Sequence, residues 1–157
     1  MRKTISILTS LIVCIEMTAC TDQYTICNQS KISNLNASFR TVSNNSDISF
    51  SASSLSMRDL TTGNVLFDQK PGISAVSSNL SLVVDSTSFA IKVSASLPAD
   101  TFTVYYTKAR LNLSLECGEI DVFNINRIKT SNNSIDSIKV LNAAVTNDFQ
   151  SNINIYF

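Results

Sequence analysis

The longest run of strand-forming residues in this chain covers residues 101–123, TFTVYYTKARLNLSLECGEIDVF. Its first half alternates, with Phe102, Val104 and Tyr106 separated by Thr103 and Tyr105. This two-residue period is typical of a strand with one buried face. A strand of this length needs partners on both sides, so the stretch predicts the centre of a β-sheet.

The second half of the same stretch has its apolar residues at odd positions, namely Leu111, Leu113, Leu115 and Cys117. A change of parity turns every side chain over, and an inserted residue is the usual cause. We therefore expect a bulge or sharp bend at residues 108–110. A hairpin there is the alternative, although residues 107–110 lack the Gly, Pro, Asn or Asp of a tight turn. Gly118 is expected to relax the backbone after Cys117.

The rest of the chain predicts an all-β protein, because Ser and Asn are abundant while the helix formers Ala, Glu and Gln are few. Further strands are expected within residues 35–39, 48–60, 65–67, 80–84, 89–95, 125–128, 138–140 and 153–157, with turns at 43–47, 61–64, 70–72, 85–87 and 130–134. Short strands spaced in this way predict a single antiparallel β-sandwich, immunoglobulin-like or related.

The first twenty residues have the layout of a secretion signal, with Arg2 and Lys3 before an apolar run at residues 5–15. This run is too short to span a bilayer as a helix. Residues 17–20, Met-Thr-Ala-Cys, resemble a bacterial lipobox, which implies that Cys20 is acylated and becomes the new N-terminus. Two features depart from the motif: Glu16 lies close to the cleavage point, and Met17 replaces the commoner Leu. The alternative is ordinary secretion with Cys20 in a disulfide.

The expected organisation is a lipoprotein signal peptide at residues 1–19, a tether carrying lipidated Cys20 at 20–30, and a β-sandwich domain at 31–157. Without Arg2, Lys3 and Glu16, the part from Cys20 onward keeps ten of the 12 basic and eleven of the 12 acidic residues. A net charge this close to zero indicates no nucleic-acid partner. We expect the protein in the cell envelope, anchored to the outer membrane and facing the periplasm or the outside.

The chain has four cysteines. Cys14 leaves with the leader and Cys20 is the proposed lipid site, so Cys27 and Cys117 remain and are expected to pair in an oxidising compartment. Closing a loop of roughly 90 residues would stabilise the fold by about 4 kcal/mol. A metal site is the poorer alternative, because the chain has no His and no CxxC spacing.

Several segments together resemble a family of small uncharacterised lipoproteins from Bacteroidota-type bacteria. They are Cys20, residues 25–27 (TIC), residues 100–106 (DTFTVYY) leading to 116–118 (ECG), residues 145–148 (VTND) and residues 153–157 (INIYF). The resemblance spans nearly the whole mature chain. It implies a β-rich envelope domain with a two-cysteine bridge and implies no activity.

Catalytic chemistry has few candidates here. A nucleophilic serine needs a base, yet the chain has no His and no SxxK motif. We therefore expect no enzyme activity and no cofactor. Glu116, Glu119 and Asp121 are the weak candidates for a hard-cation site made of oxygens. The alternative reading of these acids is a solvated strand face or edge protection.

Tyr105 and Tyr106 are expected on opposite faces of their strand. The exposed one could form a ligand or partner surface with Tyr156, although cross-strand packing is the favoured alternative. Ser86 and Ser137 each follow an Asp in a triplet that resembles a short bacterial O-glycosylation signal.

The function expected from these features is that of a non-catalytic envelope lipoprotein. It would be held at a membrane through Cys20 and would bind an envelope protein or surface ligand. One alternative is a fimbrial or adhesin-type subunit that exchanges strands with its neighbours. The other is a metal-dependent enzyme.

Overall fold

The computed structural model describes residues 27–157, which form eleven β-strands and no helix. No helix in this part of the chain qualifies as a membrane span. The strands are β1 (Asn34–Ser43), β2 (Ser46–Ser49), β3 (Leu55–Asp59), β4 (Val65–Lys70), β5 (Ala75–Asn79), β6 (Ser86–Lys92), β7 (Asp100–Ser114), β8 (Gly118–Thr130), β9 (Ser137–Val140), β10 (Ala144–Val145) and β11 (Ile153–Tyr156).

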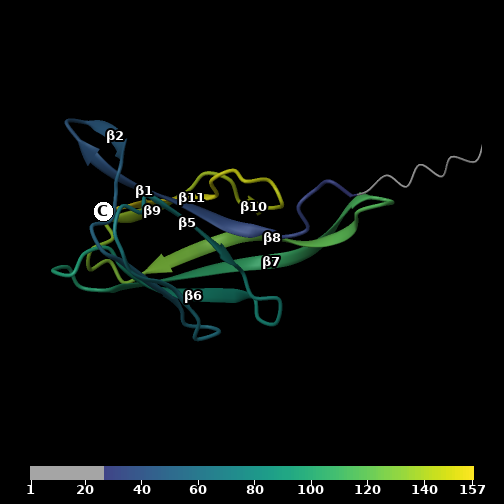
Figure 1. Cartoon of the computed structure of the whole chain (residues 1–157), viewed down its shortest axis with the longest axis horizontal. Helices are drawn as coiled ribbons and strands as arrows, with labels where there is room; N and C mark the ends of the chain where they lie inside the picture. Colours follow the sequence, from purple (N-terminus) through teal and green to yellow (C-terminus); the bar gives the residue numbers. More distant parts are fainter. Residues whose placement is uncertain (1–26) are drawn as a thin grey trace, which may run out of the picture.

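The strands form two sheets. The first sheet has five strands in the order β2-β1-β11-β9, with β5 also paired to β1. The second sheet has six strands in the order β10-β8-β7-β6-β3-β4. Figure 1 shows the two sheets as layers, with β7 as the long central strand of the second. The predicted all-β sandwich is confirmed.

One strand pair departs from the antiparallel pattern. β1 and β11 run parallel, with Ala37 opposite Ile153 and Phe39 opposite Ile155. The other strand pairings in residues 27–157 are antiparallel. The first and last strands described therefore lie side by side within one sheet.

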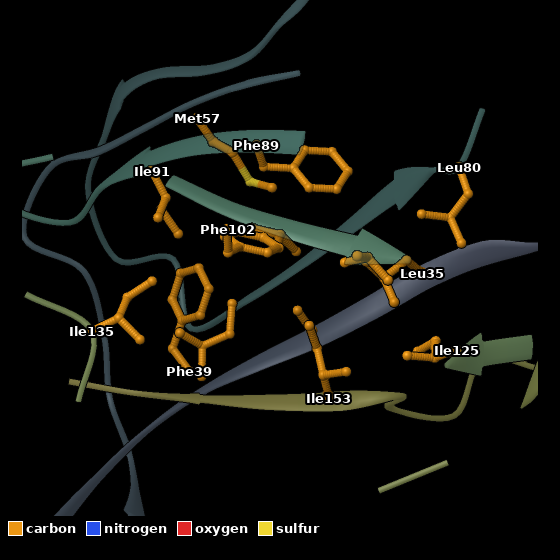
Figure 2. Close-up of a cluster of buried hydrophobic side chains, with 14 of the residues drawn as sticks. Leu35, Phe39, Met57, Leu80, Phe89, Ile91, Phe102, Ile125, Ile135 and Ile153 are labelled. Carbon is orange, nitrogen blue, oxygen red and sulfur yellow. The ribbon is translucent and has the colours of Figure 1, made fainter. Parts of the chain in front are cut away.

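The core fills the space between the sheets. The first sheet contributes Leu35, Phe39 and Ile153, and the second contributes Phe89, Ile91 and Phe102, all at most 2% exposed. Figure 2 shows these side chains meeting between the two layers. Full burial of a side chain of this size stabilises the fold by about 1.5–3 kcal/mol, so the alternating pattern on each strand determines which face turns inward.

The central stretch differs from its prediction. β7 is continuous through residues 108–110, and its ladder to β8 shifts register at two other places. The first shift lies between Tyr105 and Tyr106, where the ladder skips Asn126, and the second lies between Asn112 and Ser114, where it skips Leu113. The even positions keep their side of the strand. They become charged at Lys108 and Arg110, since Lys108 lies opposite Phe123 at the edge of the core and Arg110 lies opposite Asp121 beyond it.

The predicted burial of the odd positions is wrong for two of the four. Leu111 is 40% exposed and Leu115 is 96% exposed, whereas Leu113 is half-buried and Cys117 is buried. The chain reverses in a turn at residues 115–117. Gly118 follows with φ +73°, a left-handed conformation that glycine adopts without steric penalty.

The predicted strand at residues 80–84 is also wrong, because this segment is a loop. Its backbone binds side chains: the Ser81 amide donates to the Thr87 hydroxyl, and the Ser81 carbonyl accepts from Tyr106. The edge strand is β5, five residues earlier, and β6 begins at Ser86 where a turn was expected. Apolar alternation in Leu80, Leu82 and Val84 is thus overridden by tertiary hydrogen bonds.

Candidate functional site: the disulfide-tied end of the sandwich

The most distinctive local feature is the disulfide between Cys27 and Cys117, whose Cα atoms are 4.9 Å apart and which are 90 residues apart in sequence. Cys117 lies in the turn between β7 and β8, and its amide donates a 3.0 Å hydrogen bond to the Ser114 hydroxyl. The disulfide therefore joins the two residues that the sequence paired.

The disulfide lies at one end of the molecule. The β7–β8 hairpin extends past the other strands, and its turn ends beside the start of the described chain (Figure 1). Closing a loop of this length restricts the unfolded chain and stabilises the fold by about 4 kcal/mol. The bond therefore also fixes Cys27 to one end of the sandwich.

The core-facing side of the protruding hairpin carries ion pairs. Arg110 lies 3.5 Å from Glu119 and 3.9 Å from Asp121, and Lys108 lies 2.8 Å from Asp85. Exposed pairs of this kind contribute between nothing and about 1 kcal/mol each. These charged side chains keep this face of the β7–β8 ladder in contact with solvent where it extends past the core.

The acidic residues proposed as a weak cation site have a different setting. Glu119 and Asp121 face Arg110, while Glu116 lies in the turn. Among residues 27–157 no group of three His, Cys, Asp or Glu side chains could hold a metal ion. For Glu119 and Asp121 the arrangement matches the alternative of a solvated strand face.

Exposed aliphatic side chains occur beside β8 and along the hairpin. Ile32 (62% exposed) and Leu82 (57%) line an open hollow of about 350 Å³ together with Asp121 and Phe123. Val83 (90%) lies in the loop between β5 and β6, Leu111 (40%) on β7, and Leu115 (96%) in the β7–β8 turn. Of these side chains, Leu115 is the one in the turn that the disulfide holds.

The two neighbouring tyrosines lie on opposite faces, as expected. Tyr106 is buried, and its hydroxyl lies 2.8 Å from that of Thr87 and donates to the Ser81 carbonyl. Tyr105 lies on the outer face, where the Arg127 guanidinium sits 4.3 Å from its ring centre. The favoured alternative of cross-strand packing therefore describes Tyr105, with an arginine rather than an aromatic as its partner.

Tyr156 belongs to the other sheet and is not brought together with Tyr105. Its hydroxyl donates a 2.9 Å hydrogen bond to Asp47, which also accepts one from Arg40 at 2.7 Å. The hydrogen bond from Arg40 lowers the pKa of Asp47, and the bond from Tyr156 acts in the same direction. These residues tie β2 to β11 across β1.

Two polar residues that the sequence analysis did not single out hold the sheets together. Asp100 is 2% exposed, and its carboxylate accepts hydrogen bonds from the loop before β9. Asn152 is 1% exposed and bridges β1 to β10. In a chain this rich in Asn and Ser, neither residue stands out by composition or spacing.

The remaining predicted modification sites have separate settings. Cys20 and the proposed signal peptide lie outside the described residues. Ser86 is half-buried at the start of β6, and Ser137 is exposed at the start of β9.

The fold and this site together define a class: an all-β sandwich with one long hairpin whose turn is bonded to the N-terminal segment. A family model described as "Family of unknown function (DUF6452)" matches residues 54–157, and the chain belongs to this family. No curated protein and no solved structure matches the chain. The family match includes Cys117 but begins after Cys20 and Cys27, so the lipoprotein character suggested by the sequence stays a prediction.

Proposed function

We propose that this protein is a cell-envelope lipoprotein, anchored through an acyl-modified Cys20, whose β-sandwich is a non-catalytic binding or structural module. The observation that carries the proposal is the Cys27–Cys117 disulfide, which begins seven residues after Cys20. Structural disulfides persist in oxidising compartments outside the cytoplasm. The charged and apolar layout of residues 1–20 supports the same compartment.

A non-catalytic role is supported by the chemistry of the buried polar residues. Asp100 and Asn152 are engaged with backbone groups of their own fold. The chain has no His to act as a base, and the acids beside the disulfide face Arg110. We therefore assign these polar groups to the stability of the fold rather than to a reaction.

A self-contained module is favoured over a subunit that exchanges strands. β11 already lies between β1 and β9 within its own sheet, and Phe157 packs against Phe39 with ring centres 5.5 Å apart. A strand-exchange subunit needs an open position for a donated strand. Here the central positions of both sheets are taken by the chain's own strands.

The anchor can be tested by growing bacterial cells that express the full chain with a clickable fatty acid. We expect wild-type protein and the control Cys14→Ser to be labelled and to sediment with membranes. Cys20→Ala should lose both properties, because it removes the thiol that is acylated. Labelling of Cys20→Ala, or an unlabelled wild-type protein, would rule out the proposed anchor.

The compartment and the binding role need separate measurements. Non-reducing peptide mapping of protein from cells should find Cys27 linked to Cys117. Crosslinking of the anchored protein in intact envelopes, followed by mass spectrometry, should then recover a specific envelope component. A partner that is crosslinked equally by heat-unfolded protein would count against a folded binding module.

A further inference from the structure

We propose that the β7–β8 turn is a membrane-contacting site, with Leu115 inserting into the interfacial region of the bilayer that holds Cys20. This inference rests on the proposed lipid anchor and deepens it. Without a constraint, an anchored domain could turn any face to the lipid. The disulfide specifies which face is held nearest.

The length of chain between anchor and disulfide provides the first argument. Cys20 and Cys27 are seven residues apart, so even a fully extended connection reaches at most about 25 Å. The disulfide places Cys27 against Cys117, two residues after Leu115. The hairpin turn must therefore stay within this reach of the lipid surface, whereas the opposite end of the sandwich has no such limit.

The exposure of the side chains at this end provides the second argument. Leu115 is 96% exposed at the turn, and Leu111 is 40% exposed further down the same strand. Apolar side chains at a lipid interface bury their surface by 5–10 Å of insertion, which gives these residues a favourable environment.

The charges of the hairpin decide the kind of lipid. At this end of the molecule Lys31, Lys108 and Arg110 are balanced by Glu116, Glu119 and Asp121. A surface with this balance gains nothing from anionic headgroups. The contact should therefore depend on acyl chains and form on zwitterionic phosphatidylcholine vesicles.

The absence of Trp from the sequence allows a direct test. Acylated protein carrying Leu115→Trp has a single tryptophan at the turn, and Val42→Trp provides a matched control at a residue 63% exposed beside β2. Figure 1 shows β2 and the β7–β8 turn at opposite ends of the molecule. Each variant is reconstituted in phosphatidylcholine vesicles with and without bromine on the acyl chains, and acylation of Cys20 is verified by mass.

We expect brominated lipid to quench the tryptophan of Leu115→Trp at least several-fold more than that of Val42→Trp. Replacing both Cys27 and Cys117 by Ser in the Leu115→Trp background should reduce this quenching, because the turn is then no longer held near the anchor. Equal quenching of the two single-tryptophan variants on vesicle-bound, acylated protein would overturn the membrane contact and leave the anchor intact. A blue-shifted but unquenched Leu115→Trp would identify a second copy of the chain as the occupant instead. An unacylated Cys20 would overturn the anchor and, with it, this inference.

Discussion

The carboxylate of Asp100 accepts a 2.8 Å hydrogen bond from the backbone amide of Ile135, 35 residues further along the chain. The amides of Asn133 and Ser134 and the hydroxyl of Ser131 donate to the same carboxylate. One buried side chain at the start of β7 thereby accepts hydrogen bonds from four donors in the loop that carries the chain from the second sheet to the first.

Replacing Asp100 by Asn should destabilise the fold by about 1.5–3 kcal/mol, because an amide has one acceptor oxygen and no charge for a site built from donors. Urea denaturation at pH 7 measures the change. The control is Asp85→Asn, whose side chain is 79% exposed and pairs with Lys108. A loss of stability in Asp85→Asn as large as in Asp100→Asn would contradict this assignment.

The stability contributed by Asp100 should depend on pH. Burial raises the pKa of this carboxyl, but the hydrogen bonds from Ser131, Asn133, Ser134 and Ile135 together outweigh it and leave the pKa lowered. A lowered folded pKa gives stability that is present above the unfolded value of about 3.9 and is lost as pH falls through the folded pKa. The free energy of unfolding, measured by urea denaturation at a series of pH values, should therefore fall less steeply below pH 4 for Asp100→Asn than for wild type.

Tyr106→Phe should lower the free energy of unfolding by about 1–2 kcal/mol. The change leaves the Ser81 carbonyl without its buried donor and removes a contact to Thr87. Tyr105→Phe is the matched control, one residue away on the outer face, and should change stability by less than about 0.5 kcal/mol. Hydrogen exchange in residues 80–84 should also increase only for Tyr106→Phe.

Asn152→Asp should weaken the fold more at neutral than at acidic pH. The Asn152 side-chain nitrogen donates to the carbonyl of Ala144 at 2.9 Å and of Asn142 at 3.3 Å. A carboxylate there would face carbonyl oxygens in a buried site, whereas its protonated form could donate to one of them. Thermal unfolding at pH 4 and pH 7 tests this, with the exposed Asn124→Asp as control, and equal losses for both variants would disprove it.

Replacing Cys27 and Cys117 by Ser should reduce stability by up to about 4 kcal/mol and increase hydrogen exchange in the β7–β8 turn. The sandwich core should remain, because the core cluster that contains Phe39 and Phe102 includes no residue of the turn. Amide exchange in β6, compared with exchange in residues 111–120, separates the two effects. Exchange that rises equally in both places would show that the disulfide supports the whole fold.

Strands with a buried face could be predicted from sequence, because burial forces the two-residue period. Leu35 to Phe39, Phe89 to Ile91 and Phe102 to Tyr106 follow it and lie in the core. The pattern failed at Leu111 and Leu115, where alternation continues although the strand has left the core. A local period reports side-chain direction and carries no information on whether a second sheet lies opposite.

The disulfide could be predicted from the cysteine count, but its structural role could not. Its meaning depends on Cys117 lying in a turn at the far end of a protruding hairpin, which is a property of the assembled ladder. Asp100 and Asn152 were missed for a related reason. Their partners are backbone groups in loops that come together only in the folded state.

The parallel pairing of β1 with β11 has a kinetic consequence. Ala37 lies opposite Ile153 in this pair, although most of the chain separates the two residues in sequence. Contacts between residues so far apart in sequence form slowly. Until residues 153–156 pair with β1, the first sheet lacks β11, the strand between β1 and β9, and the core is open on that side. The first sheet therefore closes only after residues 153–156 have paired with β1, and proteases have their best opportunity before that step.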